Sequence, residues 1–199
     1  MQSSMMELPT QTRSASQRTL DSVKETIGFV PNLFATLARQ PGVVEAFVAL
    51  DTAFSEASLT PEERQVVLLT ASVENGGSYC VAGHTLFSRK LGVAESTIAA
   101  IRAAEPIGDE RLDALQSLVR KLIQERGHAT EQDLAEFALA GFTREQVLEV
   151  IMGISLKVMS NYVDSAMGLA LDEPFKSADR KSTRLNSSHR SVSRMPSSA

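Results

Sequence analysis

Apolar residues recur along most of this chain at the three- and four-residue spacing of amphipathic helices, and no strand-like alternation of any length occurs. One apolar stripe consists of Leu112, Leu115, Leu118, Val119, Leu122 and Ile123. A second stripe consists of Val147, Val150, Ile151, Ile154 and Val158. This second stripe predicts the buried face of the last long helix. The whole pattern predicts an all-α helical bundle of about eight helices with short connections.

Capping and breaking residues indicate where these helices begin and end. Thr60 is placed as an N-cap, Pro61 takes the first helical position, and Glu63 can complete a capping box. Residues 66–73, VVLLTASV, are apolar on nearly every side, so this helix is expected to be central and buried. The other predicted boundaries are a stop at Gly28 after a short helix marked by Leu20, starts at Pro31 and Val43, a stop at Gly127, and starts at Thr130 and Thr143.

The only cysteine follows a glycine pair that ends the central helix at Gly77, and Ser78 is expected to cap the next helix. Cys80 then lies in the first turn, where free N–H groups and the helix dipole favour a thiolate. His84 follows one helical turn later on the same face, where its imidazole can accept the thiol proton. The spacing predicts nucleophilic cysteine chemistry, but a buried cysteine beside a core histidine has the same spacing.

Composition narrows the class of protein. The formal net charge of −4 argues against a nucleic-acid partner, because phosphate binding needs clustered Lys and Arg. No apolar run is long enough to span a bilayer, and one cysteine cannot form an internal disulfide. A lone thiol without an export signal is typical of reducing cytosol, so we expect a cytoplasmic protein. Cys80, His84 and His128 are too few and too poorly spaced for zinc, and no metal or other cofactor is predicted.

The chain divides by composition into three segments. Residues 1–16 are rich in Ser, Gln and Thr, and we expect a flexible N-terminal segment rather than a secretory signal. Residues 17–178 carry the helical patterns and form the predicted domain. Residues 179–199, DRKSTRLNSSHRSVSRMPSSA, are expected to be a disordered tail. This string resembles the translation of a constant sequencing-adapter oligonucleotide, so we treat it as non-native and exclude His189 from the site.

The segment around Cys80 resembles a known family signature. Residues 59–85 read LTPEERQVVLLTASVENGGSYCVAGHT and resemble the carboxymuconolactone decarboxylase family, in particular its alkylhydroperoxidase D-like branch. Supporting fragments are GFVPNLFATLARQPGVVEAF at residues 28–47 and SLKVMSNYVDSAMGLALDEPF at residues 155–175. The resemblance covers roughly residues 26–175. It implies the helical fold of that family and a ring-like homo-oligomer.

In redox-active members of this family the motif is a glutamate followed by Cys-x-x-Cys-x-x-x-His. The second cysteine attacks the peroxide, the first resolves the sulfenic acid, and the glutamate and histidine relay protons. The resemblance places the attacking cysteine at Cys80 and the histidine at His84. The resolving cysteine falls on Gly77 and the glutamate on Gln65. Both are departures, because glycine cannot form a disulfide and glutamine cannot take a proton near neutral pH.

Three functions stay open at this point. The first is a peroxiredoxin-type thiol peroxidase with a degenerate one-cysteine site, which reduces a hydroperoxide and needs an external thiol reductant because Gly77 cannot resolve the sulfenic acid. The second is the lactone decarboxylation that the resemblance also implies. The third is a non-catalytic role as a homo-oligomer that binds a ligand or a partner.

Several residues other than Cys80 and His84 are expected to have structural roles around the motif. Asn75 and Tyr79 flank Cys80 and are expected to shape the site or to pack in its turn. Lys157 and Asn161 share one face of the last long helix and are expected to line the pocket or the oligomer interface. Glu63 and Glu74 are not expected to replace the missing glutamate. Glu63 is explained as a cap, and Glu74 as an exposed residue at a helix end.

Overall fold

A computed structural model describes residues 10–179, and the ends 1–9 and 180–199 lie outside the described residues. The described chain consists of helices and contains no strand. The helices of the first half are α1 (Thr10–Ile27), α2 (Asn32–Leu37), α3 (Pro41–Ser55), α4 (Pro61–Glu74) and α5 (Ser78–Lys90). Those of the second half are α6 (Glu95–Ala103), α7 (Glu110–Gln124), α8 (Glu131–Leu139), α9 (Gln146–Met167) and α10 (Glu173–Asp179). The predicted all-α fold is therefore confirmed.

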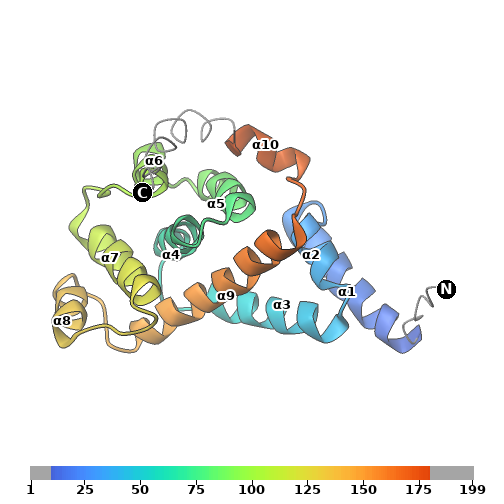
Figure 1. Cartoon of the computed structure of the whole chain (residues 1–199), viewed down its shortest axis with the longest axis horizontal. Coiled ribbons are helices and arrows are strands. Elements are labelled where there is room, and N and C mark those ends of the chain that lie inside the picture. The colour runs from blue at the N-terminus through green and yellow to red at the C-terminus, as the bar shows by residue number, and fades with distance from the viewer. Residues whose placement is uncertain (1–9, 180–199) are drawn as a thin grey trace, which may run out of the picture.

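Helix α4 lies at the centre of the bundle (Figure 1) and packs against α5, α7 and α9. The long helix α9 runs across the molecule beside α3, and α10 packs on α5. Core residues with no exposed surface come from α3, α4, α7, α9 and α10, and are Val44, Val66, Val67, Leu69, Ala71, Leu115, Val119, Val150 and Ala178. One apolar core thus holds α4 and α5 in place, and these are the helices that carry the cysteine motif.

The capping box predicted before α4 is confirmed. The Thr60 hydroxyl accepts from the Glu63 amide at 3.2 Å, and the Glu63 carboxylate accepts from the Thr60 amide at 2.8 Å. The side chains from Val66 to Ser72 are all buried, as the nearly all-round apolar sequence predicted. The cap at Thr130 also forms, with Asp133. Thr143 and Gln146 exchange the expected hydrogen bonds, but α9 begins at Gln146 with Glu145 as its N-cap residue, so the start predicted at Thr143 is wrong by two residues.

Other predictions need correction. Helix α1 begins at Thr10, so the later part of the segment 1–16, for which we expected a flexible chain, is helical. Helices α6 and α10 were not predicted individually. Residues 180–199, the greater part of the predicted tail, lie outside the described residues.

The buried face of α9 differs most from its prediction. Ile151 was expected to be buried and is 43% exposed. The residues that are buried on α9 are Val150, Gly153, Leu156, Lys157, Ser160 and Asn161. This stripe has helical spacing but includes three polar residues, because α9 presents them to the cysteine motif rather than to solvent.

None of the helices between residues 10 and 179 combines the length and the apolar character that crossing a bilayer requires.

Candidate functional site

Cys80 is placed by the tight connection between α4 and α5. Gly77, not Ser78, is the N-cap residue of α5, and Ser78 is its first helical residue. The predicted cap is therefore wrong by one residue, although Cys80 still lies in the first turn. The Cys80 side chain is buried, and its Sγ atom lies 3.5 Å from the hydroxyl of Ser160 on α9.

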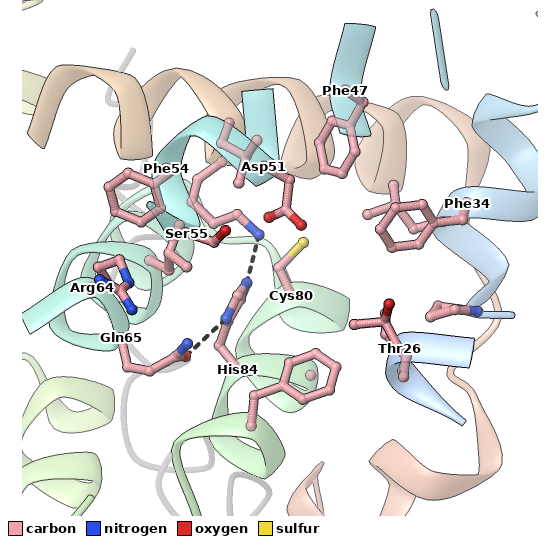
Figure 2. A pocket seen from close by; sticks show the side chains of 18 of the residues that line it. Thr26, Phe34, Phe47, Asp51, Phe54, Ser55, Arg64, Gln65, Cys80 and His84 are labelled. Carbon is pink, nitrogen blue, oxygen red and sulfur yellow. Dashed lines mark hydrogen bonds between the residues drawn. The ribbon is translucent and has the colours of Figure 1, made fainter. Parts of the chain in front are cut away.

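A cavity of about 390 Å³ opens over this turn (Figure 2). Both Cys80 and His84 line it, together with residues from α1, α3, α4, α9 and α10. Its walls are largely aromatic and aliphatic, with five phenylalanines: Phe34, Phe47, Phe54, Phe87 and Phe175. The polar lining gathers around His84 and includes Asp51, Gln65 and Lys157. An apolar cleft with a few convergent polar groups is the usual form of a small-molecule site.

Both ring nitrogens of His84 have hydrogen-bond partners, and Figure 2 draws these hydrogen bonds as dashed lines. Its Nε2 atom lies 2.7 Å from the ammonium nitrogen of Lys157, and its Nδ1 atom lies 3.1 Å from the side-chain oxygen of Gln65. Because an ammonium can only donate, Nε2 must accept. The network therefore assigns the proton of the neutral ring to Nδ1, which donates to Gln65. No hydrogen bond joins Cys80 to His84 within residues 10–179.

His84 is held in its neutral form. Burial lowers the pKa of its imidazole well below the ordinary value of 6.5, and the nearby positive charge of Lys157 lowers it further. A neutral imidazole with Nε2 already engaged cannot take the thiol proton at that nitrogen unless the Lys157 contact changes. The catalytic role predicted for His84 therefore depends on Lys157.

Lys157 is a buried cation with an unusual set of partners. The residue is 3% exposed, and within residues 10–179 the one hydrogen bond of its ammonium goes to His84. Among the described residues, no carboxylate forms an ion pair with it. Asp51 of α3 lines the same cavity, and burial by the surrounding protein raises the pKa of its carboxyl, while the charge of Lys157 opposes this shift.

Gly77 lies so close to α9 that an added side chain would collide with Asn161. A Cβ atom at this position would lie 2.1 Å from Nδ2 and 2.6 Å from Cγ of Asn161. Asn161 is fully buried, and its oxygen accepts a hydrogen bond from Asn75 Nδ2 at 3.2 Å. Thus Asn75 and Asn161 fix the end of α4 to α9 and do not line the cavity, whereas Lys157 does.

Tyr79 shapes the cavity from the other side of Cys80. Its ring packs edge-on against Phe175, with the ring centroids 5.5 Å apart. Its hydroxyl donates a short hydrogen bond to Asp172 and accepts from the Leu33 amide at 3.3 Å. Burial and the bond to Asp172 raise the pKa of this phenol well above its ordinary value, so Tyr79 stays neutral.

The first turn of α5 also faces a carboxylate, which the sequence did not indicate. Asp164 of α9 accepts from the Tyr79 amide at 3.3 Å. The Asp164 carboxylate accepts from one of the free N–H groups at the start of α5. These groups and the helix dipole were expected to favour a Cys80 thiolate, so the acid weakens that effect. Burial raises the pKa of the Asp164 carboxyl, and the hydrogen bond that it accepts from the Tyr79 amide opposes that shift.

The two glutamates near the motif lie outside the cavity. Glu63 pairs with Arg111 at 2.7 Å in addition to its cap, and Glu74 pairs with Arg120 at 3.2 Å. Asp51 and Ser160 were missed by the sequence reasoning because nothing in their local pattern links α3 or α9 to Cys80. Within residues 10–179, no three His, Cys, Asp or Glu side chains gather in a way that could hold a metal ion.

Comparisons with known proteins relate part of the sequence to one family and the fold to several solved structures. The model of the carboxymuconolactone decarboxylase family matches residues 41–119, which include Gln65, Cys80 and His84 but not Lys157. No curated protein matches the sequence.

Several solved structures share the fold. An uncharacterized peroxidase-related protein from Ralstonia eutropha, described as an alkylhydroperoxidase AhpD core, is 25% identical with a TM-score of 0.75, covering 87% of this chain and 91% of its own. A peroxidase-related protein from Silicibacter sp. is 22% identical with a TM-score of 0.72, covering 84% and 88%. The debrominase Bmp8 in complex with 2,3,4-tribromopyrrole is 15% identical with a TM-score of 0.72, covering 92% and 98%. The last two likenesses concern the fold alone.

Proposed function

Because residues 41–119 match the model of the carboxymuconolactone decarboxylase family and the described chain has the alkylhydroperoxidase D-like fold, we propose that this protein is a one-cysteine thiol peroxidase. Cys80 is the nucleophile, and His84 belongs to the group that handles the proton. The observation that carries the proposal is that the lone thiol and His84 line one cavity with aromatic walls. Such walls favour an organic hydroperoxide over hydrogen peroxide, because apolar surface gains most from apolar contact.

The reaction is a two-electron transfer from sulfur to the peroxide. The Cys80 thiolate attacks the terminal oxygen of the hydroperoxide, a sulfur–oxygen bond forms, and the oxygen–oxygen bond breaks. The bonding pair leaves on the organic oxygen, which takes a proton and departs as the alcohol. Cys80 is left as a sulfenic acid. The thiol loses one proton and the departing alkoxide takes up one, so the step is balanced.

The reductant must come from outside the chain. Cys80 is the only cysteine, and Gly77 occupies the position of a resolving thiol. One external thiol condenses with the sulfenic acid to give a mixed disulfide and water. A second external thiol then attacks that disulfide, which releases Cys80 as a thiol and the external pair as a disulfide. A reducing cytoplasm would supply such thiols, and we propose that location for this reason.

The test uses the fact that one cysteine gives an unambiguous mass change. The full chain is exposed briefly to cumene hydroperoxide with a sulfenic-acid trap, and the intact mass is measured for the wild type, Cys80→Ser and His84→Ala. We expect rapid trapping at Cys80, none in Cys80→Ser, and a rate reduced by about 10²-fold in His84→Ala. Trapping no faster than that of a free thiol such as glutathione would overturn the proposal.

Lactone chemistry is a second candidate, and one observation favours it. The cavity contains the buried ammonium of Lys157. A buried cation with one neutral partner suits an organic acid. Turnover of a carboxylated lactone by wild type and by Cys80→Ser alike would support this function over the peroxidase.

We also propose a homo-oligomer, in which the exposed face of α9 is covered. Leu148 is 68% exposed, Ile151 is 43% exposed and Tyr162 is 64% exposed on this helix. Large apolar side chains grouped on one helix are a typical interface feature. Light scattering on the full chain should give a multiple of its mass, and Leu148→Glu should lower it. If Cys80 is inert while the oligomer forms, a non-catalytic binding role is favoured.

A further inference from the structure

The site lacks an obvious acceptor for the thiol proton. Gln65 replaces the acid of the resembling motif and cannot titrate near neutral pH. Both ring nitrogens of His84 are engaged, and its ring is held neutral. Glu63 and Glu74 are bound to arginines outside the cavity. An acceptor must therefore come from another helix.

We propose that Asp51, acting through Lys157, replaces the missing carboxylate of the proton relay. The relay then enters from α3 and α9, on the side of His84 opposite Gln65. Lys157 and Asp51 are positioning and proton-transfer residues in this scheme, and the inference rests on the proposed peroxidase function.

The geometry brings Asp51 and Lys157 together beside His84. Figure 2 shows the Asp51 carboxylate directed toward the hydrogen bond that joins His84 to Lys157. An ammonium has three N–H donors, and His84 uses one of them, so two stay available to cavity groups. Asp51 and Lys157 form no closed ion pair, but both line a cavity of about 390 Å³, which has room for a bridging water molecule.

The charges around Asp51 suit a carboxyl group that accepts a proton and later returns it. The titratable or charged groups that line the cavity with it are Arg64, Tyr79, Cys80, His84, Lys90 and Lys157. Asp51 is the single carboxylate in this lining, so it has no acidic competitor there. The raised pKa of its carboxyl makes it a better proton acceptor than an ordinary aspartate.

The proton steps balance. Lys157 passes one ammonium proton to the Asp51 carboxylate and receives the Cys80 thiol proton, which leaves a thiolate, an ammonium and a carboxylic acid. The thiolate attacks the hydroperoxide as described above and the alkoxide departs. Lys157 donates to the alkoxide, Asp51 returns its proton to Lys157, and both groups regain their first states.

The first experiment measures the rate of sulfenic-acid trapping on the full chain with cumene hydroperoxide as a function of pH. Asp51→Asn should lower the rate by about 10²-fold and remove the limb that rises with pH. Asp51→Glu should keep most of the rate. Lys157→Arg keeps the positive charge but its guanidinium does not give up a proton, so it should lower the rate nearly as much as Lys157→Met. Lys24→Met is the matched control, since Lys24 of α1 is exposed and does not line the cavity. An Asp51→Asn profile equal to that of the wild type would overturn the relay.

A second measurement does not depend on activity. Carboxyl carbon NMR follows the titration of Asp51 in Cys80→Ser, with and without Lys157→Met or Lys157→Arg. Because Lys157 lowers the pKa of Asp51, Lys157→Met should raise it further. If Lys157→Met leaves the pKa of Asp51 unchanged, the coupling is overturned even if Cys80 reacts with peroxide. Normal coupling with an inert Cys80 would instead refute the peroxidase and with it the proton steps.

Discussion

The close approach of α9 to the start of α5 makes a quantitative prediction at Gly77. A Cβ atom added there would meet Asn161 Nδ2 at 2.1 Å, Cγ at 2.6 Å and Cβ at 3.1 Å. The backbone is not the obstacle, because Gly77 has φ −80° and ψ 84°, which other residues also adopt. Gly77→Ala therefore tests packing alone.

The expected loss in the free energy of unfolding of Gly77→Ala is the sum of three contributions. Overpacking a tight contact by one methyl costs about 1–3 kcal/mol. If Asn161 rotates away, it loses the hydrogen bond from Asn75, which contributes about 1 kcal/mol. The lower chain entropy of unfolded alanine offsets about 0.4–1 kcal/mol. Gly77→Ala should therefore lower the free energy of unfolding by about 1–3 kcal/mol.

Urea unfolding of four proteins separates these contributions: the wild type, Gly77→Ala, Asn161→Ala and the double variant. Truncation of Asn161 makes room for the new methyl, so the double variant should be more stable than the sum of the single changes by about 1–2 kcal/mol. Gly42→Ala on α3 is the control, because a Cβ there meets no atom within 4 Å. It should change stability by less than about 1 kcal/mol.

Two results would refute this reasoning: a Gly77→Ala protein as stable as the wild type, or single effects that simply add. The same contact predicts that a resolving cysteine introduced at Gly77 alone destabilises the fold. Gly77→Cys should be destabilised in the same way, while Gly77→Cys with Asn161→Ala should fold and form a disulfide with Cys80. Intact mass without reductant would detect that disulfide as the loss of two hydrogens.

Two further predictions concern His84 and Gly153. The folded pKa of His84 lies well below its unfolded value of 6.5, so the unfolded state binds more protons and stability falls as pH drops below about 6.5. Urea unfolding at about pH 7 and pH 5.5 should show a smaller loss for His84→Gln than for the wild type, and equal losses would contradict the neutral histidine. Gly153→Ala would place a Cβ 2.7 Å from Phe54 Cζ and Val67 Cγ1, and should cost about 1–3 kcal/mol. It should also weaken the Lys157 contact, visible as a shifted nitrogen NMR signal of His84, and an unchanged signal would show that α9 does not move.

Local sequence determined the helices and the relation of Cys80 to His84. The Thr60 capping box and the buried run of α4 depend on neighbours within a few residues, and both were predicted. Cys80 and His84 share a face of α5 because they are one helical turn apart, and both line the cavity. These features survive in any tertiary context that keeps the helices, which is why periodicity and spacing were enough.

Only the tertiary structure decided the partners of that pair. Lys157 reaches His84 across 73 residues of sequence, and Asp51 comes from a third helix. The apolar residues of α9 predicted a buried face that includes Ile151, yet the folded chain exposes Ile151 and buries Lys157 and Asn161. Periodicity fixes which residues share a helix face, but the rotation of a helix toward the core depends on packing against its neighbours. At α9 that packing includes Gly153 against α3 and α4, and it aims a lysine at the histidine of the motif.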